Sequence, residues 1–217
     1  MGGEKPKIAC LPNGPYYLLN DMTAKAVPNL RKSNGGPCQT IAGAALCRCG
    51  GSQNKPFCDG THGKNGFKDE KLTDGSADKC EHYVGKKITI HDNRGVCARV
   101  GHCTDNLKSV FKLGEEPWID PDGAAVEEII ETIKKCPSGA LSYSIENVEH
   151  KDHEREAMVT VLKDGPYAVT GGIELLDQDM AEGTSSEHYT LCRCGGSRNK
   201  PFCDGTHWQI GFKDEKN

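Results

Sequence analysis

The 217-residue sequence is poor in the apolar residues from which large cores are built. Hydrophobic residues make up 35% of it and aromatic residues 6%, whereas charged residues reach 27%. No apolar run approaches the about 20 residues that a membrane-spanning helix needs, so we expect no membrane segment. A chain of this composition forms thin cores, which usually need a metal, a disulfide or a partner to stay folded.

Several functional signatures are also missing. No run of Lys and Arg marks a nucleic-acid surface, and the two C-terminal thirds of the chain carry net negative charge, which repels phosphate. The start, MGGEKPKIAC, matches neither a signal peptide nor, with Pro6 in place of Ser or Thr, a myristoylation site. There is no nucleotide-binding loop or recognisable triad. We therefore expect a cytoplasmic protein that is not an enzyme and binds neither nucleic acid nor membranes.

Cysteine, by contrast, is abundant, with twelve in the chain. Without a secretory signal, this number indicates metal ligands in a reducing compartment rather than a disulfide framework. Two segments, residues 46–71 and 191–216, are nearly identical and share the pattern C-x-C-x8-C-x3-H. Four soft or borderline ligands in one short segment are enough to close a metal site.

The spacing divides these ligands into two pairs. Cys47 and Cys49 are separated by one residue, so an extended segment places both side chains on one face. Cys58 and His62 are four residues apart, so one helical turn, with Asp59 as a suitable N-cap, brings them together. The second copy repeats this arrangement with Cys192, Cys194, Cys203, Asp204 and His207.

Two pairs of ligands suit a two-iron cluster that takes two ligands on each iron. The glycines after the second cysteine, Gly50-Gly51 and Gly195-Gly196, let the backbone turn tightly beside the inorganic sulfurs. The alternative is a structural zinc, whose ligands can also be three Cys and one His. Zinc sites, however, usually pair their cysteines as C-x2-4-C rather than C-x-C.

These residues resemble the CDGSH, or NEET-type, iron–sulfur family. Both copies read CDGTH, with Thr61 and Thr206 in place of the family's serine, a change that keeps the hydroxyl. The resemblance implies a 2Fe-2S cluster in each copy, bound by the three cysteines and the histidine, with the histidine on the outer iron. Standalone members pair as intertwined dimers. The two copies here are therefore expected to form an internal pseudo-dimer within a monomer.

A third cysteine pattern lies between the two copies. Bacterial ferredoxins use C-x2-C-x2-C with a remote C-P, and Cys97, Cys103 and Cys136 occupy the first, third and remote positions. Val100 stands at the middle position and cannot bind iron. The segment resembles the divergent single-cluster ferredoxin family that is often fused to CDGSH domains and is commonly labelled 4Fe-4S.

The missing ligand leaves the type of the central cluster open. Loss of one corner ligand predicts a 3Fe-4S cluster. His102 or Asp105 as a fourth ligand would instead give 4Fe-4S, and a third alternative is a domain that has lost its cluster. Cys10, Cys38 and Cys80 belong to none of the three patterns, and we expect them to be buried structural thiols.

Hydrophobic periodicity predicts the elements around these residues. We expect an α+β protein in which small β-rich CDGSH domains at residues 8–77 and 156–217 flank a ferredoxin-like α+β domain at 78–147. The charged run 146–156 is predicted to be a solvated linker. The expected strands cover residues 16–19, 87–90 and 142–145, and the expected helices cover residues 105–111 and 124–135.

Such sites predict a redox function. Iron–sulfur clusters accept and release single electrons, and imidazole titrates near neutral pH, which would couple electron transfer to protons at His62 or His207. We expect a multi-cluster protein that carries electrons between redox partners. The alternative is cluster transfer or storage, or redox and pH sensing, because protonation of a histidine ligand releases iron. The partner is accordingly a redox protein or a cluster acceptor.

Overall fold

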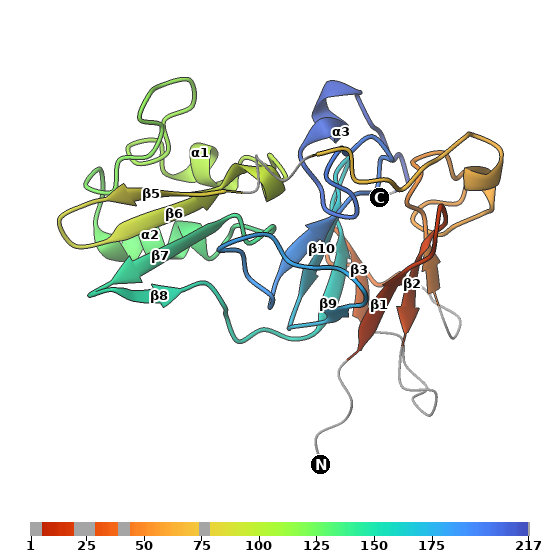
Figure 1. Ribbon diagram of the computed structural model, residues 1–217, viewed down its shortest axis with the longest axis horizontal. Coiled ribbons are helices and arrows are strands. Elements are labelled where there is room, and N and C mark those ends of the chain that lie inside the picture. Colours follow the sequence, from red (N-terminus) through yellow and green to blue (C-terminus); the bar gives the residue numbers. More distant parts are fainter. Residues whose placement is uncertain (1–5, 20–28, 39–43, 74–78, 217) are drawn as a thin grey trace, which may run out of the picture.

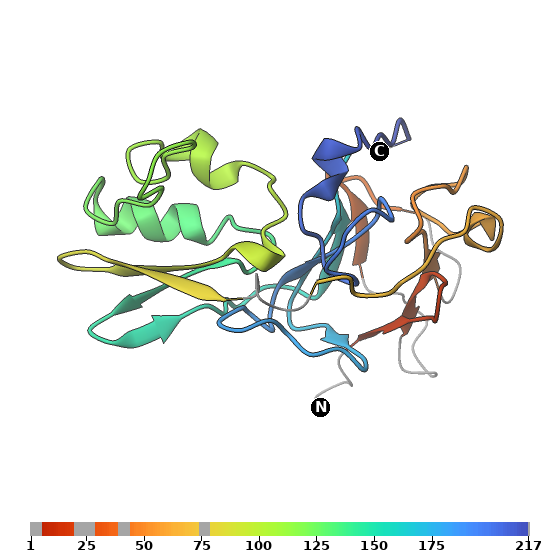
Figure 2. The same cartoon turned by 45° about the horizontal axis from the view of Figure 1, so that its top comes forward.

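Three four-stranded sheets form the framework of the protein. The computed structural model describes residues 6–19, 29–38, 44–73 and 79–216. The sheet of the central segment lies at one end of the molecule, and the two sheets built from the N- and C-terminal segments lie at the other (Figures 1 and 2). Helices are few and short, so the predicted sheet-rich α+β character is confirmed.

The first sheet combines strands from both ends of the chain, in the order β11-β1-β2-β4. Buried and more exposed side chains alternate along β2, which fits a strand with one face on the core and confirms the strand predicted at residues 16–19. β11 joins the sheet parallel to β1. The strands are β1 (Lys7–Cys10), β2 (Tyr16–Leu19), β4 (Ala44–Leu46) and β11 (Glu174–Leu175).

The second sheet mirrors this exchange, in the order β12-β10-β9-β3. Here the N-terminal segment supplies the edge strand, because β3 pairs parallel to β9. Each of these two sheets therefore contains one strand from the opposite end of the chain. The strands are β3 (Asn29–Lys32), β9 (Met158–Val161), β10 (Tyr167–Thr170) and β12 (Tyr189–Leu191).

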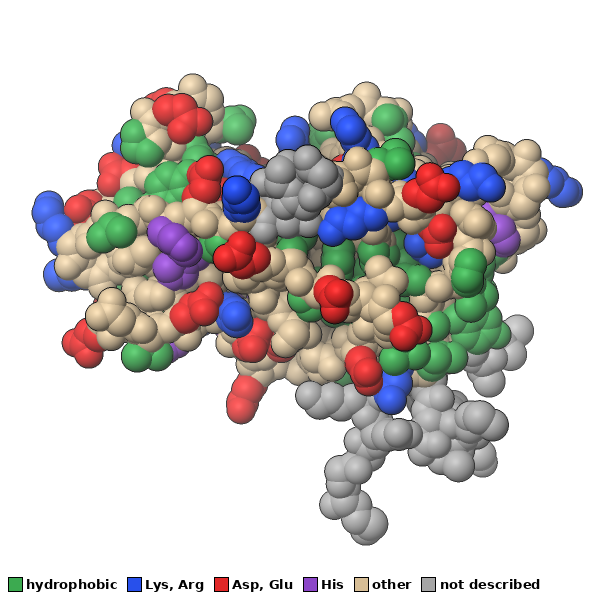
Figure 3. Space-filling model, viewed as in Figure 1, with side chains coloured by type: hydrophobic (Ala, Val, Ile, Leu, Met, Phe, Trp, Pro, Cys, Tyr) green, Lys and Arg blue, Asp and Glu red, His purple; other side chains and the backbone are tan. Residues whose placement is uncertain are grey.

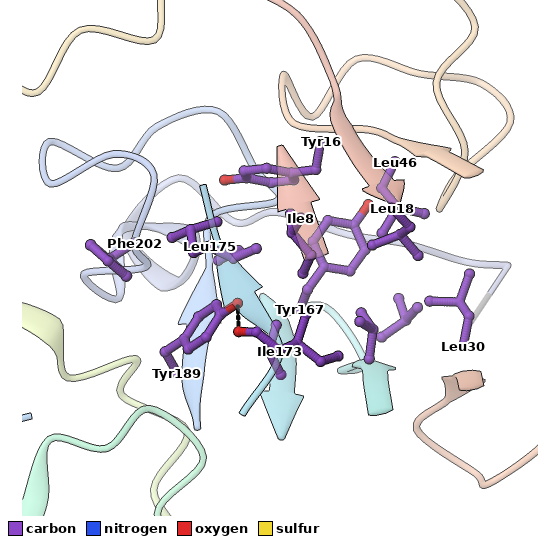
Figure 4. Packing of buried hydrophobic residues seen from close by; sticks show 14 of the residues in the cluster. Ile8, Tyr16, Leu18, Leu30, Leu46, Tyr167, Ile173, Leu175, Tyr189 and Phe202 are labelled. Atoms are coloured by element: carbon purple, nitrogen blue, oxygen red, sulfur yellow. Dashed lines mark hydrogen bonds between the residues drawn. The ribbon is translucent and has the colours of Figure 1, made fainter. Parts of the chain in front are cut away.

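One hydrophobic core lies between these two sheets (Figure 4). At its centre the rings of Tyr16 and Tyr167 meet edge to face, with centroids 6.0 Å apart, and neither side chain is exposed. Aromatic pairs prefer this geometry. Side chains from both sheets surround the pair, among them Ile8, Leu18, Leu30, Leu46, Val159, Val169, Ile173, Leu191 and Phe202.

The third sheet, β5-β6-β7-β8, is antiparallel and belongs entirely to the central segment. Helix α2 (Val126–Ile133) packs on it, with Ile129 and Ile133 fully buried in a separate core. Glu127 and Glu128 lie in the first turn of α2, where carboxylates stabilise the helix dipole. The strands are β5 (Cys80–Val84), β6 (Thr89–Asn93), β7 (Leu141–Ile145) and β8 (Val148–His150).

Two predictions for the central segment are wrong. The helix expected at residues 105–111 is instead α1 (His102–Asn106), which ends because Leu107 leaves the helical region at φ −141° and ψ 68°. The charged run 146–156 is not all linker, since its first residues form a turn and β8. Cross-strand pairing with β7 outweighs the polar composition of this stretch.

The described residues contain no helix with the length and apolarity needed to cross a bilayer. On the face shown in Figure 3, basic and acidic side chains are interspersed rather than gathered into one patch.

Candidate metal centres

The cysteines of each C-x-C pair lie directly after a strand, β4 or β12, and point to the same side. The Sγ atoms of Cys47 and Cys49 are 3.9 Å apart, and those of Cys192 and Cys194 are 3.8 Å apart. We call the site in the N-terminal copy the first site and that in the C-terminal copy the second site. The predicted alternation of an extended segment accounts for both pairs.

The cysteine–histidine half of each site forms as predicted through a single helical turn. Sγ of Cys58 lies 3.4 Å from Nδ1 of His62, and Sγ of Cys203 lies 3.5 Å from Nδ1 of His207. The turns are a short 3-10 helix (Thr61–Gly63) and α3 (Thr206–Gln209).

The prediction that Asp59 is the N-cap of this turn is wrong, since the N-cap residue is Gly60. Asp59 instead stabilises the first site through hydrogen bonds to two backbone amides. One carboxylate oxygen of Asp59 accepts the Thr61 N–H at 3.0 Å and the other accepts the Gln53 N–H at 2.8 Å. Hydrogen bonds from the Thr61 side chain and these amides hold the pKa of Asp59 below its usual range. Asp59 thus ties the turn that carries His62 to the preceding loop, and Asp204 makes the equivalent bonds in the second site.

The ligands of each CDGSH site form two pairs, one of two cysteines and one of a cysteine and a histidine. A structural zinc needs four ligands around a single centre. Two separate pairs of soft ligands match the two irons of a 2Fe-2S cluster, which thiolates and imidazole bind well.

The three predicted cysteines of the central segment line one pocket, here called the central site. Cys97 precedes α1, Cys103 lies within it and Cys136 follows α2. Of the two candidates for a fourth ligand, His102 lines this pocket, whereas Asp105 is not among the residues that line it. The donor set therefore fits a cuboidal iron–sulfur cluster held by three thiolates.

Comparison with known proteins shows which families these segments are similar to. A family model described as "Iron-binding zinc finger CDGSH type" matches residues 13–63 and 164–208, and one described as "Divergent 4Fe-4S mono-cluster" matches residues 83–146. The chain belongs to the CDGSH iron-binding family. It carries two CDGSH regions with the divergent mono-cluster domain between them.

Similarity to curated proteins covers a shorter stretch of the chain than the family models do together. The uncharacterized protein YjdI of Escherichia coli K12 is 39% identical over 75 residues, which are 35% of this chain and 95% of YjdI. YjdI of E. coli O157:H7 matches equally well. No solved structure matches this CDGSH protein.

Burial favours the neutral form of three of the predicted ligand thiols, those of Cys47, Cys103 and Cys203. It raises the pKa of Cys47 to about 11 and that of Cys103 to about 12, and it also raises the pKa of Cys203. Iron binds the thiolate, so loading these sites releases protons. Buried ligand thiols of this kind are stabilised as thiolates by the bound metal.

The two CDGSH sites adjoin each other through their C-x-C loops. Cys49 and Cys194 form an antiparallel bridge between the copies. A Cβ on Gly50 would collide with the Cys194 carbonyl, and one on Gly195 would lie 2.6 Å from the Cys49 carbonyl oxygen. The glycines thus have a role beyond the tight turn that was predicted, because they allow the backbones of the two loops to touch.

The mono-cluster domain between the two CDGSH regions, here called the central domain, packs against the second CDGSH site. The Arg99 side chain lies against Gly205, where an added Cβ would meet its Cδ at 2.5 Å. The Asn199 side chain donates to the Gly95 carbonyl at 2.9 Å. In this site His207 is only 5% exposed.

Among the residues that the structure describes, none covers the first CDGSH site in this way, and nothing lies within 4 Å of a Cβ added at Gly60. Cys58 and His62 are both partly exposed, although the sequence of their loop is nearly identical to that of the second site. The motif alone therefore does not predict the exposure of its ligands.

Val100 links the central site to the second site. It lines the pocket of the three central cysteines and also a neighbouring cavity of about 290 Å³. His207 and Trp208 line the same cavity. The position at which the ferredoxin pattern lacks a cysteine thus faces the histidine side of the second CDGSH site.

The motifs do not single out two tyrosines, Tyr16 and Tyr167, that support the ligand loops. The Tyr16 O–H donates to the carbonyls of Cys192 at 3.0 Å and Pro201 at 2.8 Å, and the Tyr167 O–H donates to those of Cys47 at 2.8 Å and Pro56 at 2.9 Å. Each tyrosine therefore holds the ligand loop of the opposite copy. The Gly-Pro-Tyr sequence shared by residues 14–16 and 165–167 was the available signal.

The arginine between each pair of cysteines points away from them. Arg193 is buried, donates to the carbonyls of Gly165 and Leu162 at 2.7 Å each, and pairs with Asp214. Arg48 makes the corresponding ion pair with Asp69 at 3.3 Å. These arginines fix the ligand strand from behind.

The three cysteines outside the motifs are free thiols, only partly buried rather than buried as predicted. Cys10 and Cys38 pack against the core between the two exchanged sheets, and Cys80 lies at the start of β5.

Proposed function

We propose that this protein carries single electrons between redox partner proteins and is not itself an enzyme. A reduced partner loses one electron and an oxidised partner gains it. When bound, iron–sulfur clusters accept and release single electrons. The first and second sites would each hold a 2Fe-2S cluster, and Cys97, Cys103 and Cys136 would hold a 3Fe-4S cluster, or a 4Fe-4S cluster if His102 supplies a fourth ligand.

The observation that carries this proposal is the direct contact between the three sites. The C-x-C loops of the first and second sites touch at Cys49 and Cys194. The central domain reaches the second site through Arg99, packed on Gly205, and through Val100. The second site therefore lies between the other two. A protein that only stored separate clusters would not need to place them in series.

We also infer that the two copies form an internal pseudo-dimer. Each contributes a strand to the other's sheet, through the pairs β1–β11 and β3–β9. Tyr16 and Tyr167 cross between the copies in the same reciprocal way. One chain thereby supplies both halves of an intertwined unit, and a monomer suffices.

Iron and acid-labile sulfide analysis, combined with EPR before and after reduction, tests the function. Two 2Fe-2S clusters and one 3Fe-4S cluster amount to about seven irons per chain. We expect this number together with the EPR signal of an oxidised 3Fe-4S cluster. About eight irons without that signal would indicate 4Fe-4S at the central site. About four irons would leave the central site empty and contradict the electron-carrying proposal.

The exposure of the first site favours a second candidate function, cluster transfer. We expect an iron chelator to remove the first cluster several-fold faster than the second, because the central domain shields only the second. The comparison uses Cys203→Ser, which keeps the first site, and Cys58→Ser, which keeps the second. Loss is followed by visible absorbance. Equal rates in the two variants would contradict the role of the central domain as a cover.

A further inference from the structure

An arginine next to the central site makes three contacts at once. Arg94 begins the short helix Arg94–Val96, just before Cys97. Its Nη1 donates to the Sγ atom of Cys97 at 3.7 Å, and its Nε lies 3.0 Å from Oδ2 of Asp92. Its guanidinium carbon also lies over the Trp118 ring, 3.5 Å from the centroid. No motif in the sequence singles out this residue.

Asp92 and Trp118 hold the guanidinium in place. The Asp92 side chain, near the end of β6, is 1% exposed, and Trp118 is 7% exposed. Burial raises the pKa of Asp92 to about 6, against the lowering effect of Arg94. Both residues line the same pocket as the three cysteines. Such a contact, with one ion pair and one stacked face, leaves the planar arginine fork little freedom.

The three central cysteines are not equivalent in this respect. Cys97 receives a charged donor, whereas Cys136 lies 3.5 Å from the neutral hydroxyl of Ser138. Reduction adds negative charge to a cluster and its thiolates, and a cationic donor stabilises that charge more than a neutral one does.

We propose that Arg94 raises the reduction potential of the central cluster by donating a hydrogen bond to the thiolate of Cys97, and that Asp92 and Trp118 are positioning residues for its guanidinium. This inference rests on the proposed function, because it requires a cluster at the central site.

The test is an EPR-monitored redox titration of the cluster-loaded full chain. Arg94→Gln removes the charge and the stacked fork, and we expect the one-electron equilibrium to shift about tenfold toward the oxidised state, a fall of about 59 mV. Arg94→Lys keeps the charge but not the fork, so its shift is expected to be smaller. The matched control is Lys86→Gln, which removes the same charge from a side chain 86% exposed in the same domain. Its potential should equal that of the native protein.

A double-mutant cycle tests the positioning role of Asp92. If Asp92 acts through Arg94, Asp92→Asn lowers the potential more, or raises it less, in the native background than in Arg94→Gln. Equal shifts in both backgrounds would show that Asp92 acts only as a charge and would overturn that part of the inference.

The possible failures can be told apart. A native protein without iron at the central site would contradict the proposed function itself. A native protein that holds the cluster, with Arg94→Gln and Lys86→Gln at the same potential, would overturn the inference and leave the function standing. If Arg94→Gln does not retain the cluster, Arg94→Met takes its place, and a potential equal to that of Lys86→Gln overturns the inference.

Discussion

Replacement of Gly50 with alanine is expected to prevent the ligand loops of the two CDGSH sites from closing against each other. The new Cβ would collide with the Cys194 carbonyl, which is backbone and cannot move aside as a side chain would. Gly50 also has φ +74°, a conformation that costs other residues about 1–2 kcal/mol. Together, strain and collision should lower the free energy of unfolding by about 3 kcal/mol or more, as in other severe cases of backbone strain.

Gly60→Ala is the matched control for this variant. Gly60 has φ +85°, but nothing lies within 4 Å of an added Cβ. It therefore imposes the backbone strain without the collision and should cost about 1–2 kcal/mol. Denaturant unfolding of both variants, together with their cluster absorbance, measures the difference. Equal losses would mean that the two C-x-C loops do not meet.

Tyr16→Phe is expected to weaken the second site although Tyr16 belongs to the N-terminal copy. The change removes the O–H that reaches the carbonyls of Cys192 and Pro201. A buried carbonyl left without its partner costs about 1–3 kcal/mol. Release of iron to a chelator from the second site should therefore accelerate about tenfold. Tyr167→Phe should have the same effect on the first site.

Single-site variants make this crossed effect visible. Of the two CDGSH clusters, Cys58→Ser leaves only the second and Cys203→Ser leaves only the first, so each tyrosine variant is measured in both backgrounds. Tyr17→Phe removes a hydroxyl from a neighbouring ring that is 37% exposed, and it serves as the control. If each tyrosine acted on the site of its own copy, the exchange of contacts between the copies would be refuted.

Local spacing predicted the parts of the sites that form within a few residues. The C-x-C and CDGTH segments bring their ligand atoms together through one extended stretch and one helical turn, so the sequence distance fixes the geometry. The strand at residues 16–19 was predictable because its apolar run is also a local signal.

Contacts between distant segments were not predictable in this way. The role of Gly50 depends on a carbonyl of the other copy, and the turn at Gly205 is contacted by Arg99 of the central domain. Arg94 lies over the ring of Trp118, which belongs to a separate segment of the chain. None of these residues forms a pattern with a fixed spacing, so only the folded chain relates them.

The exchanged strands also set the order in which the chain can fold. β1 pairs with β11, and β3 pairs with β9, so the N-terminal copy pairs with segments that lie far away in the sequence. Such long-range pairing slows folding, whereas the antiparallel central sheet relies on nearer neighbours. During synthesis the central domain can therefore fold before the C-terminal copy exists. The first metal site, although translated first, gains its supporting tyrosine and sheet partners only when the last part of the chain arrives.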